Sequence, residues 1–277
     1  MDNNPLKQYF RRPSVYMKLP SNGQGYPEGS LEMPENGELP VYPMTAIDEI
    51  TARTPDALFN GTAVAELITS CVPNIKDPWS VPNVDLDALL IAIKAASSTS
   101  GEMDLETICP NTDCNEISTY KINLAAILTS ITSPDYSKEL EAGDLKVKLK
   151  AVSFKDINAA SMKQFEFQRV ASQLDAIENE ADRNKLLKDS LEKVTELTMD
   201  LMCSSIEYIQ TPTIKVDQKD FILDFLKHCD RNVYISIRDR SAELRSVSEI
   251  KPMKITCGSC QHEFEQAITL NPTDFFD

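Results

Sequence analysis

The sequence predicts an α+β protein, mainly helical, with a small zinc-ribbon-like element from two distant cysteine hairpins and an extended N-terminal arm. Apolar residues recur at helical spacing through most of the chain, and two close cysteine pairs each lie between alternating, strand-like stretches. The first 43 residues hold seven of the 16 prolines and four of the eight glycines. The expected segments are an arm over 1–43, an N-terminal helical part over 44–101, a first cysteine hairpin over 102–123, a helical body over 124–249, and a second cysteine hairpin with a C-terminal tail over 250–277.

The arm cannot form a long helix, because proline lacks the amide donor and restricts the residue before it. It nevertheless carries spaced apolar and aromatic residues, which favours an arm that lies along the body or a partner over a disordered tail. Its basic residues have the sign opposite to the acidic remainder. The apolar set is Tyr9, Phe10, Val15, Tyr16, Leu19, Tyr26, Leu31, Met33, Leu39, Val41 and Tyr42, and the basic set is Lys7, Arg11, Arg12 and Lys18.

Helical spacing follows the arm. Thr45 is a candidate N-cap for a first helix, and Asn60 to Thr62 precede a second. The segment 88–96 is apolar nearly all round and predicts a buried helix, capped by Asp85 or Asp87. These carboxylates are interpreted as caps or parts of a solvated face.

The region 145–152 alternates lysine with leucine or valine, which predicts a strand with one wet face. The region 155–209 predicts two helices joined by a polar turn over 178–184. Core packing is the default for their apolar stripes, although the spacing also fits a coiled coil with another chain. One stripe is Val170, Leu174 and Ile177; the other is Leu187, Leu191, Val194, Leu197 and Leu201. A short strand over 213–216 and two further helices, near 221–226 and 232–247, follow.

Seven cysteines in a chain that shows no secretory signal are not typical of a disulfide framework. Cys71, Cys203 and Cys229 lie in apolar helical patterns and are interpreted as small buried hydrophobes.

The remaining cysteines, Cys109 with Cys114 and Cys257 with Cys260, form two pairs with metal-ligand spacing. Four thiolates satisfy a tetrahedral zinc ion, and a closed site of this kind is structural, since no position is left for water. Gly258 is expected to permit the second turn, with backbone amides directed at sulfur. Two alternatives stay open, four unmetallated cysteines or a redox pair at 257 and 260, although that pair does not open a helix.

Composition limits the function. The net charge of -15 argues against nucleic acid and anionic membranes as main partners. Neither histidine, His228 or His262, lies near a recognisable nucleophile motif, and the sequence contains no phosphate-binding loop. We therefore expect no catalytic and no cofactor-binding residues, and zinc as the one bound group.

Several stretches then resemble a known family. They are Asn4 to Pro13, Lys18 to Tyr26, Glu38 to Glu49, Thr54 to Gly61, Val72 to Trp79 and Asp85 to Ile93, with the ending Leu270 to Phe276. They are similar to base plate hub and hub-assembly proteins of T-even-like contractile-tailed bacteriophages. The resemblance implies a non-enzymatic tail morphogenesis protein in the host cytoplasm during assembly or in the virion baseplate. Its implied partners are other hub or tail proteins, the tape measure protein, or further copies of itself.

Two functions of other classes compete with this one. A zinc-ribbon nucleic-acid-binding regulator would explain the cysteine pairs, but the chain lacks a basic stripe. A thiol-disulfide enzyme would require a metal-free, redox-active pair at Cys257 and Cys260.

Overall fold

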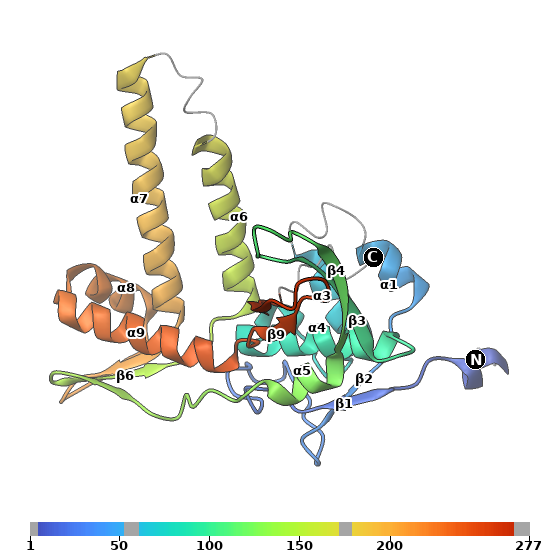
Figure 1. Ribbon diagram of the computed structural model, residues 1–277. Helices are drawn as coiled ribbons and strands as arrows, with labels where there is room; N and C mark the ends of the chain where they lie inside the picture. Colours follow the sequence, from blue (N-terminus) through green and yellow to red (C-terminus); the bar gives the residue numbers. More distant parts are fainter. Residues whose placement is uncertain (1–4, 53–60, 172–178, 269–277) are drawn as a thin grey trace. The chain divides into compact units, whose positions relative to one another are not determined.

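The computed structural model describes residues 5–52, 61–171 and 179–268, which fall into two compact units (Figure 1). Unit 1 takes the chain up to residue 78, residues 84–133 and the chain from residue 248 onward; unit 2 takes residues 79–83 and 134–247. Helices accompany small antiparallel sheets in both units. The α+β class is therefore confirmed.

The described residues of unit 1 form three two-stranded antiparallel sheets and four α-helices. The strand pairs are β1 with β2, β3 with β4, and β9 with β10. Its elements are η1 (Pro5–Tyr9), β1 (Val15–Met17), β2 (Leu39–Val41), α1 (Ala46–Ala52), α3 (Thr62–Cys71), α4 (Asn83–Ser97), β3 (Glu102–Ile108), β4 (Ile117–Asn123), α5 (Leu124–Ser130), β9 (Met253–Thr256) and β10 (Glu263–Gln266); η2 (Pro78–Ser80) lies where the chain leaves the unit.

Helix α4 is the centre of the unit 1 core. Leu89, Ile91 and Ile93 on it are fully buried, as expected for a helix that is apolar nearly all round. Ile91 belongs to an apolar cluster with Ile122 of β4 and Ile268, which follows β10. The two cysteine hairpins thus rest on the same core.

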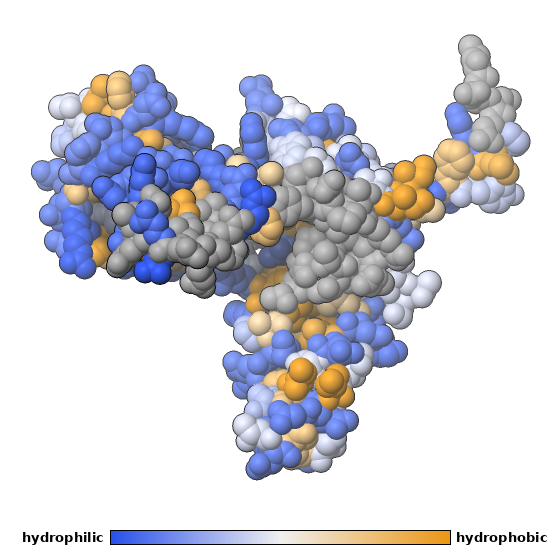
Figure 2. Space-filling model, turned by 90° about the horizontal axis from the view of Figure 1, so that it is seen from above, coloured by the Kyte–Doolittle hydropathy of each residue, from blue (hydrophilic) through white to orange (hydrophobic). Residues whose placement is uncertain are grey.

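Much of the segment expected as an arm packs into this core. Met17, Leu19, Leu39 and Val41 are at most 6% exposed, and the Ser14 N–H donates to the Val41 carbonyl at 3.0 Å. Of the two placements expected, residues 15–41 take the one along the chain's own body. Residues 5–10, which we call the N-terminal hook, leave three large apolar side chains mostly outside: Leu6 is 61% exposed, Tyr9 77% and Phe10 58%. Further along, Tyr16 and Met33 are also exposed, each as a single side chain. Figure 2, coloured by hydropathy, shows hydrophobic surface in orange on the projecting segment at its upper right.

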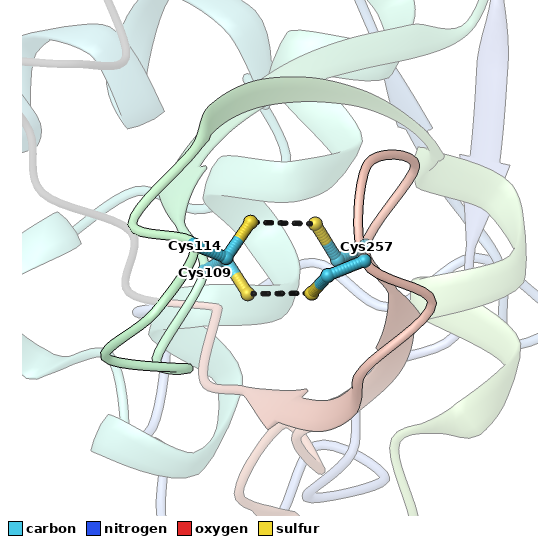
Figure 3. A group of neighbouring side chains, drawn as sticks. Cys109, Cys114 and Cys257 are labelled. Carbon is cyan, nitrogen blue, oxygen red and sulfur yellow. Dashed lines mark hydrogen bonds between the residues drawn. The ribbon is translucent and has the colours of Figure 1, made fainter.

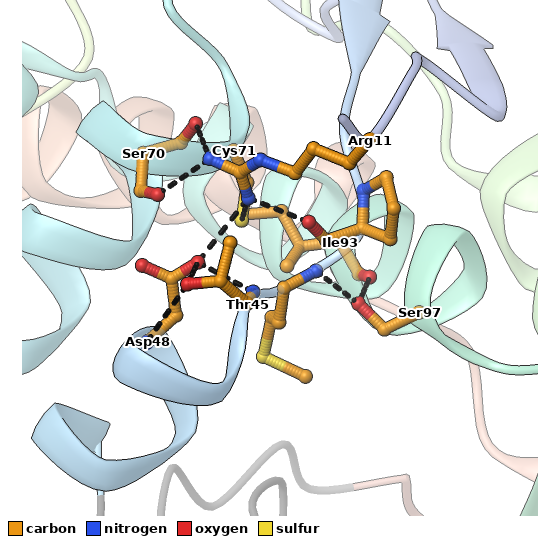
Figure 4. Close-up of polar contacts among 9 residues, drawn as sticks. Arg11, Thr45, Asp48, Ser70, Cys71, Ile93 and Ser97 are labelled. Atoms are coloured by element: carbon orange, nitrogen blue, oxygen red, sulfur yellow. Dashed lines mark hydrogen bonds and ion pairs between the residues drawn. The ribbon is translucent and has the colours of Figure 1, made fainter. Parts of the chain in front are cut away.

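Arg11 fixes the root of the hook (Figure 4). Its guanidinium donates to the Pro43 carbonyl at 2.6 Å, and to the Ser70 carbonyl and hydroxyl at 2.8 Å each. It also contacts Asp48 at 3.2 Å. Asp48 in turn accepts from the Thr45 N–H at 2.7 Å, while its own N–H donates to the Thr45 hydroxyl at 3.2 Å, so Thr45 caps α1 as the sequence predicts.

Asp85 corrects one sequence interpretation. It was expected at a helix cap or on a solvated face, but α4 begins earlier, at Asn83, and Asp85 is 0% exposed. Its carboxylate accepts from the Ser21 N–H at 2.7 Å and from the Ser21 hydroxyl at 2.5 Å. A turn of the proline-rich segment thus finds its hydrogen-bond partner inside the core. Burial raises the pKa of Asp85 to about 6, although the bonds from Ser21 oppose the shift.

We predict that Asp85→Asn changes the pH dependence of stability. The native pKa of about 6 lies above the ordinary 3.8, so the native state binds the proton more tightly. This stabilisation is complete below pH 3.8 and is lost as pH rises through 6. Relative to Asp85→Asn, the wild type should therefore gain about 2 kcal/mol between pH 7 and pH 4. Urea unfolding of both proteins across this range measures the difference; a constant difference would contradict the raised pKa.

Unit 2 is built on a four-stranded antiparallel sheet in the order β5-β6-β7-β8. Its buried cluster joins Val147 and Leu149 of β6 with Ile209 of β7, Ile222 of α8 and Ile237 of α9. Its elements are β5 (Leu140–Ala142), β6 (Leu145–Leu149), α6 (Phe154–Ala171), α7 (Glu180–Ser204), β7 (Ile206–Gln210), β8 (Lys215–Val216), α8 (Lys219–His228) and α9 (Arg231–Ser248).

The helices of this unit differ in part from those expected. The helix expected to reach residue 209 ends at Ser204, because Ile206 and Ile209 are buried in β7, which pairs with β6. Helices α6 and α7 lie side by side (Figure 1). Leu174, Ile177 and the start of the expected turn, residue 178, lie outside the described residues, as does the side chain of Val170. The turn expected over 178–184 is wrong from residue 180 onward, because α7 already begins at Glu180.

Candidate metal centre

Two β-hairpins of unit 1 carry the four paired cysteines. Strands β3 and β4 pair from Glu102 opposite Asn123 to Ile108 opposite Ile117, which leaves Cys109 and Cys114 in the connecting turn. Strands β9 and β10 pair from Met253 opposite Gln266 to Thr256 opposite Glu263, which leaves Cys257 and Cys260 in theirs. Both strand–turn–strand predictions are confirmed.

The turns bring the four sulfurs together (Figure 3). The Sγ atoms of Cys109 and Cys260 are 3.7 Å apart, and those of Cys114 and Cys257 are 3.9 Å apart. All four sulfurs lie within 4.8 Å of one another. Each close pair joins one hairpin to the other, across 151 and 143 residues of sequence.

This spacing fits a tetrahedral metal ion. With Zn–S bonds of about 2.3 Å, tetrahedral geometry places sulfurs about 3.8 Å apart. A disulfide requires about 2.05 Å, and all four cysteines are free thiols in the structure. Four soft sulfur donors without an oxygen ligand favour zinc over magnesium or calcium.

Backbone N–H groups stabilise the negative charge of one thiolate, that of Cys257. The N–H groups of Cys260 and Ser259 point at the Cys257 sulfur and lower the pKa of this thiol to about 7. Burial instead raises the pKa of Cys109 to about 12. A cation among the sulfurs would stabilise all four thiolates, which otherwise repel one another.

The turn residues differ from those expected. Gly258 does not take a positive φ, and a methyl group at this position would meet nothing within 4 Å. Left-handed backbone falls instead on Gln261, with φ 61°, and on Asn115, with φ 46°, each just after the second cysteine of its pair. The requirement for an unusual backbone conformation therefore lies at the exit of each turn, and Gly258 is replaceable there.

Three further contacts support the site, and the sequence analysis did not identify them. Thr107 donates its hydroxyl to the Gln266 side-chain oxygen at 2.6 Å, and the Tyr120 hydroxyl reaches the Thr256 carbonyl at 3.4 Å. Asn111 Nδ2 lies 3.7 Å from the Cys260 sulfur. The first two contacts join the hairpins independently of the cysteines. Only the inward position of Thr107 on an alternating strand could have indicated its role.

The other three cysteines, Cys71, Cys203 and Cys229, do not belong to this cluster. Cys71 and Cys203 are buried, and Cys229 is half-buried beside the Leu226 carbonyl. His262 follows the second turn, is exposed, and stacks its ring near Phe264, with the ring centres 6.3 Å apart.

Comparison with known proteins identifies the family. The family model described as T4 bacteriophage base plate protein matches residues 15–277. The chain belongs to this family. No curated protein and no solved structure gives a significant match. The family resemblance predicted from the sequence is thus confirmed, and it places this base plate family member among phage tail proteins.

The match covers both hairpins and both units, but it begins after the N-terminal hook. Among the described helices of this base plate protein, none is both long and apolar enough to span a membrane.

We predict that Cys257→Ser removes bound metal and destabilises both hairpins together, because metal-binding free energy contributes to folding. The wild type should hold one zinc per chain by elemental analysis, and Cys257→Ser close to none. The thermal midpoint should fall by at least about 5 °C, because one or two kcal/mol already shifts a domain of this size by that amount.

Cys229→Ser is the matched control, since this half-buried cysteine lies outside the cluster. It should retain zinc. A wild type without zinc after expression in zinc-supplemented medium, or equal zinc in Cys257→Ser and wild type, would refute the metal assignment.

Proposed function

We propose that this chain is a non-enzymatic component of the baseplate hub, as a structural subunit or a hub-assembly factor, and that it acts through protein–protein contacts. The observation that carries the proposal is the family match over residues 15–277. Its direct partners would be other hub or tail proteins, including the tape measure protein. It would assemble with them in the host cytoplasm.

The N-terminal hook supports a role in assembly. Three large apolar side chains within five residues are more than half exposed. The residue that follows them, Arg11, is anchored to the body of the unit by several hydrogen bonds of its guanidinium. An exposed apolar group on a fixed root is typical of a segment that inserts into a partner surface. Lys7 and Arg12 beside it favour an acidic partner surface, such as that of another copy of this chain.

We further propose that the four cysteines hold a structural zinc ion in a zinc-ribbon-like arrangement. The sulfur spacing supports this proposal, as does a closed ligand set that leaves no open coordination position. The ion would stabilise the pairing of the two hairpins. The same convergence argues against the redox alternative, because Cys257 and Cys260 share their surroundings with two further thiols.

A phage with a stop codon early in this gene tests the proposed function. Tails should fail to complete, as seen by electron microscopy of infected-cell lysates, and the chain supplied from a plasmid should restore them. Quantitative mass spectrometry of purified particles then separates the two roles: a stoichiometric virion protein is a hub subunit, and one confined to lysate is an assembly factor. Normal infectious particles without the chain would refute both.

We predict that the double variant Tyr9→Ser and Phe10→Ser folds normally but fails to support tail assembly. Both side chains are mostly exposed, so the thermal midpoint should move by less than about 2 °C. Plasmid complementation of the stop-codon phage should fall at least about tenfold, since anchoring aromatic residues often contribute 2 kcal/mol or more to an interface.

Tyr16→Ser is the matched control. Tyr16 is 59% exposed in the same unit, on β1 and outside the hook. Equal complementation by the hook variant and by this control would show that the hook is not an interface.

A further inference from the structure

Helices α6 and α7 of unit 2 present an apolar stripe that the described residues cover only in part. Along the outer part of the hairpin, none of the described side chains of α6 after residue 160, or of α7 before residue 203, is buried. Leu187, Leu191 and Val194 of α7 are 40%, 65% and 43% exposed. Their spacing of four and three residues places them on one face of α7. Figure 1 shows the two helices side by side, with α7 the longer.

Two threonines extend this stripe without adding unsatisfied polar groups. The Thr195 hydroxyl donates to the Leu191 carbonyl at 2.8 Å, and the Thr198 hydroxyl donates to the Val194 carbonyl at 2.8 Å. Because both donors are already used within the helix, a partner that covers this face leaves no hydroxyl proton unbonded. The stripe can therefore be desolvated at low cost.

The stripe leads into a cavity of about 350 Å³ within unit 2. Thr198, one helical turn beyond Val194, lines it together with Leu201. Ile157 and Gln164 of α6 contribute to the walls. A partner that follows the stripe along α7 would thus reach the cavity near Thr198.

The charges of this cavity are of one sign. Lys150 and Arg245 line it, and no carboxylate is found among its described lining residues. Lys150 is half-buried at the end of β6, where its backbone N–H donates to the Ser205 carbonyl at 2.8 Å. In a chain with a net charge of -15, such a cavity is a local cationic site.

A second cavity, also lined by residues of α6 and α7, differs from the first in its charges. It has a volume of about 320 Å³ and is lined by three aspartates and two lysines, so its charges are mixed. The lining residues concerned are Asp156, Lys163, Asp200, Lys219 and Asp220. Of these two cavities, the first adjoins the apolar stripe and has lysine and arginine but no carboxylate among its described lining residues.

We propose that the stripe and this cavity together bind an amphipathic helix of a partner protein, with an acidic side chain of that helix directed at Lys150 and Arg245. The face from Leu187 to Thr198 is about 16 Å long, which matches about three turns of a helix packed alongside. Side chains at three- and four-residue spacing on such a helix interdigitate with those of α7. The carboxylate gives the helix its polarity and register in the groove.

A model peptide tests this proposal. The probe is a fluorescein-labelled three-heptad peptide with leucine at positions a and d and glutamate at the remaining charged positions; its partner peptide carries lysine in place of glutamate. Fluorescence anisotropy with the full chain should show binding of the glutamate peptide, and at least tenfold weaker binding of the lysine peptide. Leu191→Ser should weaken binding of the glutamate peptide at least tenfold, and Lys150→Gln at least threefold.

Ile214→Ser is the matched control, since Ile214 is an aliphatic residue of the same unit, 60% exposed and outside both cavities. It should bind like the wild type. Circular dichroism checks that each variant is folded, as the 65% exposure of Leu191 leads us to expect.

Three results of the binding experiments would overturn the proposal. They are absence of binding by the glutamate peptide, equal binding of both peptides, or equal loss in Leu191→Ser and Ile214→Ser. Sedimentation equilibrium of the chain alone addresses the competing occupant. A dimer that Leu191→Ser converts to a monomer would mean that a second copy occupies the groove, and the partner-helix proposal would then be wrong.

Discussion

The convergence of four sulfurs from two distant hairpins is the constraint on which the order of unit 1 depends. Cys109 and Cys260 meet across 151 residues of chain, and the whole of residues 134–247 lies between the hairpins in sequence. Closing a loop costs entropy that grows only with the logarithm of its length, about 0.6 kcal/mol for each doubling. Unit 2 can therefore be as large as it is without a heavy penalty, provided that the ends of its chain are held in unit 1.

Polar side-chain contacts hold the proline-rich N-terminal segment in place, because it has little secondary structure to do so. This stretch forms few backbone ladders, so many of its donors and acceptors need other partners. Asp85 supplies them to Ser21 from within α4, and Arg11 links the segment to Pro43 and Ser70. Each contact spans tens of residues in sequence. Asp85 is buried and Arg11 half-buried, and both charged groups fix a segment that apolar packing alone would leave loosely specified.

Features that follow from a local sequence pattern were predicted well. Features that depend on a partner far away in the sequence were predicted less well. Alternating strands and paired cysteines predicted both hairpins, and helical spacing predicted most helices. Asp85 was misinterpreted because its partner, Ser21, is 64 residues away and a carboxylate near a helix start is usually a cap. Residues 206–209 were assigned to a helix because their pairing with β6 is not encoded locally. In the candidate site, the paired spacing pointed to the four cysteines that the structure brings close together. Asn115 and Gln261, which carry the left-handed backbone, have no sequence signature comparable to glycine.

The paired hairpins also determine how mechanical load would travel through the molecule. Covalently, the route from the hook at residues 5–10 to the second hairpin runs through all of unit 2. The contacts of Thr107 with Gln266 and of Tyr120 with Thr256, together with the sulfur cluster, provide a shorter route within unit 1. Tension between those two points would be carried by unit 1, and the fold of unit 2 would remain unstretched. A protein connected in this way can transmit force through one unit while the other keeps its shape.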